Sequence, residues 1–277
     1  MAHLTGKERA DYVQNMFDRI ARRYNLMNRL MTFGQDMSWR RFVIQRAQLP
    51  QNGALLDLAT GTGDIAFEAL RHAPNATVVG GDFSLGMMQV GMHLKYGDQV
   101  GWTGADAMNL PYRDASFDAV VSQFGLMFFE DRGAAIAQMA RVLKPGGTLA
   151  IAVWDSLENT PGYAMMVDLL QRLFGKDVGD ALRAPYNLGD TQQLRNLFAD
   201  APLTDLTVHT LPGEARFPSI DDWVFTDIKG WVLADVLDDQ QVEVLLQAAR
   251  QDLSKFVTAE GQVAFDAPAH IVTARKL

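Results

Sequence analysis

The sequence predicts an α/β fold, in which a mostly parallel sheet carries helices on both of its faces. From residue 54 onwards, short apolar runs alternate with helix-like segments, a spacing typical of strand–helix–strand units. Residues 54–59 are apolar at every position except Asp57, as in a strand that is buried on both faces. The chain has 277 residues, 48% of them hydrophobic, which is enough for one large domain or for a core domain with a substantial insertion.

The first fifty residues are expected to be helical. Apolar side chains at helical spacing predict a helix over residues 7–24, and an apolar stretch follows over residues 26–33. A second helix is expected over residues 39–48, with Ser38 as its N-cap.

Five strands and three helices are then expected in alternation. The strands are predicted at residues 54–59, 76–81, 100–104, 117–122 and 148–154. The helices are predicted at residues 64–73, 84–95 and 130–143, and residues 144–147 form the turn that stops the last of them. Beyond residue 154 the alternation is lost, with strands at 203–211 and 271–276 and helices near 161–174, 190–199, 219–230 and 239–256. We interpret this part as the end of the sheet with helical insertions, which commonly cover a ligand cleft.

Composition excludes several classes of protein. The chain has no cysteine, which excludes disulfides, thiolate zinc sites, iron–sulfur clusters and cysteine nucleophiles. Its five histidines are scattered without the spacing of metal ligands, and no metal site is expected. No apolar run reaches the roughly 18 residues of a membrane span. Because the first residues lack an apolar signal segment, a cytoplasmic location is expected.

Charge is unevenly distributed along the chain. The 33 acidic and 25 basic residues leave a net charge of −8, which argues against a nucleic-acid partner. Residues 1–50 nevertheless carry nine bases and four acids, a net of +5. Solvated helix faces are the simplest interpretation, while an anionic ligand or peripheral contact with an anionic membrane surface stays open. Nothing in the sequence indicates an oligomeric state.

A glycine loop follows the first expected strand. Gly61, Gly63 and Ala66 fit the G-x-G-x-x-G/A pattern, in which glycines let the backbone turn tightly and approach a ligand. The loop alone does not separate a nicotinamide dinucleotide from S-adenosyl-L-methionine. A nicotinamide-dependent oxidoreductase is therefore a competing hypothesis.

Acidic residues lie at the ends of three successive expected strands. Asp57, Asp82 and Asp106 fall where the carboxyl ends of parallel strands meet, the edge at which open α/β sheets bind ligands. A carboxylate there can accept both hydroxyls of a ribose (Asp82) or the amino group of adenine (Asp106). Several carboxylates would repel a pyrophosphate, whereas S-adenosyl-L-methionine carries a sulfonium and an ammonium. Each Asp alone could be a cap or turn residue, but together they favour S-adenosyl-L-methionine.

Five motifs occur in the order found in class I S-adenosyl-L-methionine-dependent methyltransferases, and residues 50–154 resemble that superfamily. The motifs lie at residues 56–64, 81–88, 106–111, 117–121 and 141–147. The front of the chain narrows the match, because residues 12–28 and 34–41 resemble the ubiquinone/menaquinone biosynthesis C-methyltransferases. After residue 154 the resemblance ends, in the region that usually builds the substrate pocket of these enzymes.

The resemblance implies a fold and a division of the chain. The fold is a doubly wound, mostly parallel seven-stranded sheet of Rossmann-like type, whose last strand is antiparallel, with N-terminal helices and helical insertions covering the cleft. Residues 1–49 would form an N-terminal helical cap and residues 50–154 the S-adenosyl-L-methionine-binding core. Residues 155–277 would form the end of the sheet with substrate-covering insertions.

The resemblance also implies roles for individual residues. The residues expected to contact the cofactor are Tyr24, Asp57, Ala59, Gly61, Thr62, Gly63, Asp82, Phe83, Met87, Asp106, Ala107, Gln123 and Phe124. Within this set, residues 61–63 would cradle the methionine part, Asp82 would hold the ribose and Asp106 the adenine. Met27, Phe128 and Trp154 are candidates for the acceptor pocket, although aromatic side chains at such positions serve equally often as core.

The expected reaction is methyl transfer to a small, apolar or aromatic acceptor, with a carbon atom of a quinone-, phenol- or polyketide-like molecule favoured. A sulfonium is a good leaving group, so positioning and exclusion of water can supply most of the catalysis. A base is needed only where the acceptor must lose a proton. His209, Asp155 and Glu158 are weak candidates for that base, because residues of these types at such positions are more often structural. Methylation at oxygen or nitrogen of another metabolite stays open, as does a non-catalytic binding module with the same fold.

Overall fold

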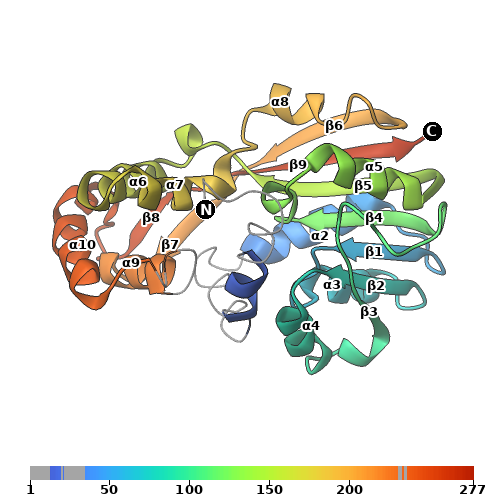
Figure 1. The fold of residues 1–277 in the computed structure, drawn as a ribbon, viewed down its shortest axis with the longest axis horizontal. Coiled ribbons are helices and arrows are strands. Elements are labelled where there is room, and N and C mark those ends of the chain that lie inside the picture. Colours follow the sequence, from blue (N-terminus) through green and yellow to red (C-terminus); the bar gives the residue numbers. More distant parts are fainter. Residues whose placement is uncertain (1–12, 20, 22–34, 230–232, 234–235) are drawn as a thin grey trace.

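The computed structural model describes residues 13–19, 21, 35–229, 233 and 236–277, and a sheet of seven strands lies at its centre (Figure 1). In spatial order the strands are β3 (Val100–Gly104), β2 (Thr77–Asp82), β1 (Ala54–Leu58), β4 (Phe117–Gln123), β5 (Leu143–Trp154), β9 (Ala269–Lys276) and β6 (Leu203–Leu211). Neighbouring strands pair in parallel except β9, which is antiparallel to both β5 and β6. The predicted doubly wound sheet with an antiparallel last strand is thereby confirmed.

Helices cover both faces of this sheet because its strands are apolar on both sides. Successive side chains of a strand point to opposite faces. Leu55 accordingly packs with α2 (Gln35–Ala47) and α3 (Asp64–His72), whereas Leu56 packs with α5 (Arg132–Val142) and α8 (Thr191–Asn196). Both leucines are fully buried. A further helix, α4 (Leu85–Met92), lies beside β2 and β3 (Figure 1).

A group of helices extends beyond the carboxyl ends of the parallel strands, at the left of Figure 1, and we call it the helical lobe. Its elements are α6 (Pro161–Phe174), α7 (Lys176–Arg183), β7 (Glu214–Phe217), α9 (Ile220–Lys229), α10 (Asp239–Asp252) and β8 (Val263–Asp266). β7 and β8 pair as a separate two-stranded antiparallel sheet, although α9 and α10 lie between them in the chain. The lobe has a core of its own around Tyr163, Trp223 and Phe265, and Met16 from the helical residues 13–19 packs into it. None of the helices that the structure describes is long and apolar enough to cross a membrane.

Most of the predicted elements are present. β3, β6 and α6 have the predicted bounds, and the other predicted strands and helices differ by a few residues at their ends. The helix predicted over residues 7–24 is observed at residues 13–19 and 21. The remainder of that segment and the apolar stretch at residues 26–33 lie outside the described residues.

One local prediction is wrong, and some elements were not predicted. Ser38 is not an N-cap, because α2 begins at Gln35 and no helix-breaking residue separates the two positions. The helix before residues 144–147 ends at Val142, as predicted, but Leu143 already pairs with Phe117 and the register then shifts, so these residues form a bulge inside β5. The short helix α7 and the paired strands β7 and β8 were not predicted. Elements of this length show no periodicity in sequence and depend on packing against the lobe core.

A carboxyl group is buried in the core of the lobe. Asp227 of α9 is fully buried, and its Oδ2 accepts a hydrogen bond from Trp223 Nε1 at 2.6 Å. Burial raises the pKa of Asp227 to about 8, although the hydrogen bond from Trp223 partly opposes this. The folded lobe therefore holds this group in its protonated form near neutral pH.

Because folding raises the pKa of Asp227, its contribution to stability is complete below the ordinary aspartate pKa of 3.8 and is lost as the pH rises through about 8. Asp227→Asn keeps an oxygen for Trp223 and cannot ionise. We expect the melting temperature of the variant, relative to the native protein, to increase steadily from pH 4 to pH 8, as measured by circular dichroism. Asp200→Asn, at an exposed position, is the control and should show no such trend. A constant difference for Asp227→Asn across this range would contradict the assignment.

Candidate active site

A cleft opens at the carboxyl ends of β1, β2, β3 and β4, and the helical residues 13–19 form one of its walls. Its lining is Val13, Gln14, Phe17, Leu58, Ala59, Gly61, Asp82, Phe83, Ser84, Met87, Ala105, Asp106, Ala107, Met108, Gln123, Phe124, Gly125, Phe128, Phe129 and Glu130. The cleft holds about 1010 Å³ of space, its open mouth included. Small-molecule sites are typically about 300–1,000 Å³ in size.

The loop after β1 is shaped by a buried carboxylate. Asp57 Oδ2 accepts hydrogen bonds from Thr60 Oγ1 at 2.6 Å and from Ala66 N at 3.1 Å, and so ties the loop to the first turn of α3. Burial raises the pKa of Asp57 to about 7. Gly63 caps α3 in the left-handed conformation, with φ of 86°, and a Cβ there would lie 2.6 Å from the ring of Trp102. Glycine is required at this position for both its conformation and its size.

Asp82, the last residue of β2, lines the cleft between two loops. Its Oδ2 accepts a hydrogen bond from Gly61 N at 2.7 Å, and its Oδ1 accepts one from Ser84 N at 2.7 Å. Burial raises the pKa of Asp82 to about 6, although these backbone hydrogen bonds oppose the shift. Each carboxylate oxygen retains a lone pair, so the group can also accept hydrogen bonds from ligand hydroxyls.

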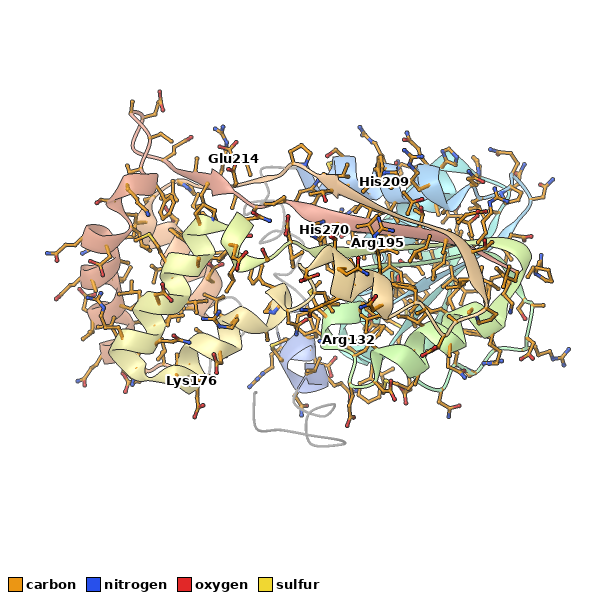
Figure 2. All side chains as sticks on the ribbon, turned by 90° about the horizontal axis from the view of Figure 1, so that it is seen from above. Arg132, Lys176, Arg195, His209, Glu214 and His270 are labelled. Carbon is orange, nitrogen blue, oxygen red and sulfur yellow. The ribbon has the colours of Figure 1, made fainter. Side chains whose placement is uncertain are left out.

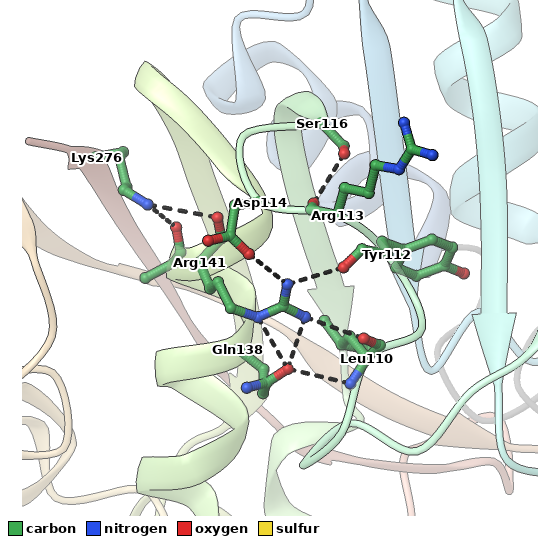
Figure 3. Close-up of polar contacts among 9 residues, drawn as sticks. Leu110, Tyr112, Arg113, Asp114, Ser116, Gln138, Arg141 and Lys276 are labelled. Carbon is green, nitrogen blue, oxygen red and sulfur yellow. Dashed lines mark hydrogen bonds and ion pairs between the residues drawn. The ribbon is translucent and has the colours of Figure 1, made fainter.

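The loop after β3 brings residues 106–108 to the cleft. Asp106 Oδ1 accepts a hydrogen bond at 2.9 Å from the backbone amide two residues further on. On the far side of this loop, Arg141 of α5 donates to the carbonyl oxygens of Leu110 at 3.0 Å and Tyr112 at 2.8 Å (Figure 3). Arg141 therefore fixes the loop that carries Asp106 to the helix behind it.

The electrostatic character of the cleft is one-sided. Asp82, Asp106 and Glu130 are acidic, and none of the described lining residues is lysine, arginine or histidine. Charges in a partly buried site interact more strongly than in water and attract ligands of opposite sign. This lining suits a cationic ligand that carries hydroxyl groups, and it opposes the binding of a pyrophosphate.

Aromatic rings form the other side of the cleft. Phe124 stacks on Trp154 with a centroid distance of 4.2 Å and an interplanar angle of 11°, and Trp39 meets both rings edge-on. Phe17 meets Phe128 edge-on at 5.4 Å. Trp154 does not itself line the cleft, but it supports Phe124 from behind. The result is an apolar wall opposite the acidic residues.

Backbone strain concentrates where β1 and β4 end. Ala59 and Phe124 both have φ of 57°, a left-handed conformation that costs a non-glycine residue roughly 1–2 kcal/mol. Phe124 N donates to Ala152 O at 2.9 Å, and a Cβ on Gly125 would lie 2.5 Å from Ala59 Cβ, so the two strand ends are closely packed. Beside them, the buried Nε2 of Gln123 has no hydrogen-bond partner among the residues that the structure describes. Such strain and unsatisfied polarity are typical of functional sites.

The structure brings most of the predicted cofactor residues together. Those that line the cleft are Ala59, Gly61, Asp82, Phe83, Met87, Asp106, Ala107, Gln123 and Phe124, and the acceptor candidate Phe128 joins them. Asp57, Thr62 and Gly63 do not line it and shape the glycine loop from behind. Tyr24 and Met27 lie outside the described residues.

The three candidate bases lie away from the cleft. His209 is on the edge strand β6, packs edge-on against Phe42 at 5.6 Å and, because of burial, has a lowered pKa (Figure 2). Asp155 is buried after β5, where its Oδ1 lies 3.1 Å from Nε2 of His270. Glu158 is exposed. None of the three lines the cleft.

Several lining residues were not singled out from the sequence. Val13, Gln14 and Phe17 belong to a helix whose periodicity is clear in the sequence, but the periodicity does not say which face meets the cleft. Met108 lies in a loop, and Glu130 precedes α5, where an acidic residue is expected simply to stabilise a helix N-terminus. Only the assembled fold distinguishes these residues from their neighbours.

Comparison with known proteins identifies relatives of this chain. The model of the ubiE/COQ5 methyltransferase family matches residues 5–174. The ubiquinone/menaquinone biosynthesis C-methyltransferase UbiE of Desulfotalea psychrophila is 48% identical over 135 residues, which cover 49% of this chain and 55% of that protein. The enzyme of the same name from Geotalea daltonii is 36% identical over 174 residues, covering 61% and 72% respectively. This chain thus spans little more than half of the first relative's length.

Among solved structures, phosphoethanolamine N-methyltransferase 2 of Haemonchus contortus has a TM-score of 0.56 at 17% identity. The match covers 86% of this chain and 52% of that one, which was solved with phosphomonomethylethanolamine and S-adenosylhomocysteine. At this identity the similarity concerns the fold. The family match ends in α6, so most of the helical lobe lies outside it.

Gly63 and Gly146 both have a left-handed backbone, but only Gly63 is closely surrounded by other side chains. Alanine substitutions at the two positions therefore distinguish the cost of backbone strain from the cost of steric crowding. Gly63→Ala should lose stability through both effects, whereas Gly146→Ala, with φ of 75° and no atom within 4 Å of its Cβ position, should lose only the roughly 1–2 kcal/mol of strain. We expect Gly63→Ala to be the more destabilised in urea unfolding. Equal losses would show that Trp102 and Phe67 do not restrict the loop.

Proposed function

The chain belongs to the ubiE/COQ5 methyltransferase family, and on that premise we propose that it transfers the methyl group of S-adenosyl-L-methionine to a carbon atom of a small aromatic acceptor. A quinone-, phenol- or polyketide-like molecule is the favoured acceptor. The observation that carries the proposal is the lining of the cleft, with three acids and no base among its described residues, next to a glycine loop. A doubly cationic ligand without phosphate fits this lining, and a nicotinamide dinucleotide does not.

The proposed cofactor contacts follow from the position of each group. Asp82, held by the amides of Gly61 and Ser84, would accept hydrogen bonds from the two ribose hydroxyls. Asp106 would accept a hydrogen bond from the amino group of adenine, and Met87 would pack against the adenine ring. The amides at the glycine loop and the start of α3 would bind the carboxylate of the methionine part, as helix N-termini commonly do.

The cofactor, when bound, supplies a methyl group on a positively charged sulfur, which the acceptor carbon takes by in-line displacement. The protein's task is to position the two partners and exclude water, which in favourable cases contributes roughly 7–11 kcal/mol. Gln123 and Phe124 lie at the end of β4, next to the strained Ala59, and we assign them to the border of the transfer site. The buried Nε2 of Gln123 is a donor without a partner in the described part of the chain, and an oxygen atom of the acceptor would satisfy it.

The acceptor is proposed to lie against the aromatic side of the cleft. Phe17, Phe124 and Phe128 offer edges and faces suited to a flat ring, and Trp154 stacks behind them. The two similar enzymes described above act in ubiquinone and menaquinone biosynthesis by name. Because the lobe after residue 174 lies outside the family match, the acceptor of this chain need not be the same, and transfer to oxygen or nitrogen is the alternative.

We also propose a division of labour along the chain. Residues 1–49 would cap the cleft, residues 50–154 would bind the cofactor, and residues 155–277 would complete the sheet and cover the acceptor. The packing of Met16 in the lobe core and of Phe17 at the cleft supports this arrangement. Small-molecule sites commonly lie between such parts of a protein.

Thermal-shift titration tests the cofactor. We expect S-adenosylhomocysteine to raise the melting temperature in proportion to the logarithm of its concentration, because a ligand that binds only the folded state stabilises it. NAD and NADH should have no effect. Stabilisation by NAD but not by S-adenosylhomocysteine would replace the proposal with an oxidoreductase.

The pH dependence of binding tests the role of Asp82. Because its pKa is about 6 and the ionised form is the better hydrogen-bond acceptor, the Kd for S-adenosylhomocysteine should be constant above pH 7. Below pH 6 it should rise by about tenfold per pH unit. Asp82→Asn should weaken binding at pH 8 by roughly tenfold or more, the loss of one charge-assisted hydrogen bond. Calorimetric titration measures both effects.

A control variant and the pH dependence of binding in Asp82→Asn show whether Asp82 is the group that titrates. Asp98→Asn, at an exposed position, is the matched control and should leave both the Kd and its pH dependence unchanged. In Asp82→Asn the rise below pH 6 should disappear. If it persists, another group controls binding, and Asp57, with a pKa of about 7, becomes the candidate.

A further inference from the structure

The helix formed by residues 13–19 contacts three parts of the molecule at once. Val13, Gln14 and Phe17 line the cleft, whereas Met16, only 2% exposed, packs into the core of the helical lobe. In Figure 1 this helix, in dark blue, lies between α9 of the lobe and α4 beside the sheet. It therefore connects the part of the cleft assigned to the cofactor with the lobe.

Asp18 fastens this helix to the N-terminus of α4. Its Oδ1 accepts hydrogen bonds from Ser84 Oγ at 2.5 Å and from Gly86 N at 2.8 Å. The amides in the first turn of a helix have no partner within the helix and carry partial positive charge, so a carboxylate is favoured there. A Cβ on Gly86 would lie 2.7 Å from the same oxygen, so the contact leaves no room for a side chain. Gln14 Nε2 adds a hydrogen bond to Phe83 O at 3.0 Å.

Ser84 connects this contact to the cofactor carboxylate. Its amide donates to Asp82 Oδ1 at 2.7 Å, while its hydroxyl donates to Asp18 and accepts from Met87 N at 3.2 Å. Ser84 is only 2% exposed, so water does not replace these partners easily. Ser84 thus contacts both Asp18, which holds the helix of residues 13–19, and Asp82, which is assigned to the ribose.

We propose that Asp18 is a positioning residue of the cofactor cleft: through Ser84 and α4 it holds the helix of residues 13–19 against the cleft, and release of this contact sets the rate at which the cofactor product leaves. The ligand named here rests on the proposed function. The contact between Asp18 and α4 does not, and it can be tested without any ligand.

The first measurement is hydrogen–deuterium exchange of the protein alone. Asp18→Ala should speed exchange of the amides of residues 13–19 by about tenfold, the equivalent of one charge-assisted hydrogen bond. Asn15→Ala, at an exposed position on the same helix, is the matched control and should leave exchange unchanged. Equal exchange in Asp18→Ala and the native protein would overturn the proposal.

The second measurement is stopped-flow binding of S-adenosylhomocysteine. Asp18→Ala should raise the dissociation rate about tenfold without lowering the association rate, and Asp18→Asn, which keeps an acceptor oxygen, should recover part of the loss. A slower association in both variants, or no change in dissociation, would overturn the proposal, because it would mean a general loss of structure or no role for the contact.

A double-mutant cycle locates the coupling. If Asp18 acts through Ser84, the combined effect of Asp18→Ala and Ser84→Ala on dissociation should be smaller than the product of the single effects. Multiplicative effects would remove Ser84 from the pathway and overturn that part of the proposal. If the native protein does not bind S-adenosylhomocysteine at all, the proposed function fails, whereas the exchange experiment still decides whether Asp18 holds the helix.

Discussion

The cleft depends on two hydrogen bonds to one carboxylate. Asp82 lies at the end of β2. It accepts one hydrogen bond from the amide of Gly61, in the loop after β1, and one from the amide of Ser84, just before α4. A parallel sheet brings these loops to the same edge but does not set the distance between them. Asp82 sets it, and because the group is buried its two bonds are stronger than they would be in water. Through Ser84 the same group is linked to Asp18, and so to the helix of residues 13–19, which forms one wall of the cleft.

Besides holding the glycine loop, the sheet connects the cleft to the helical lobe. Trp154, the last residue of β5, stacks on Phe124 at the cleft and lies 6.4 Å from Tyr186, which belongs to the lobe core. A strand buried in the centre of the sheet thus ends in a ring that contacts both the cleft and the lobe. Changes in the lobe can alter the aromatic side of the cleft while leaving Asp82 and the glycine loop in place. This explains physically how a family match confined to residues 5–174 is compatible with a different acceptor side.

Much of the fold could be predicted from the sequence because strands buried on both faces leave a strong local pattern. Residues 54–59 and the glycine loop are such a case, and the acids at the strand ends follow from it. What could not be predicted depends on contacts between distant segments. Asp57 is predicted beside the ligand, yet its partners Thr60 and Ala66 place it behind the loop. The helix containing Phe17 is predictable, but the side it presents to the cleft depends on contacts with distant segments, among them the hydrogen bonds that Asp18 accepts from Ser84 and Gly86.

The acids in and behind the cleft also support the cationic ligand proposed above. Burial raises the pKa of Asp57 to about 7, with a further increase from repulsion by Asp82 and Asp64, and it raises the pKa of Asp82 to about 6, with a further increase from repulsion by Asp18. Near neutral pH Asp82 is therefore mostly ionised and Asp57 is partly protonated, and burial disfavours the charged form of both groups. A bound cation stabilises the ionised carboxylates, so binding and release of a proton are thermodynamically linked. An anionic ligand would have the opposite effect and would add its own repulsion. The buried carboxylates therefore cost free energy in the protein without a ligand, and the same carboxylates would favour the binding of a positively charged methyl donor.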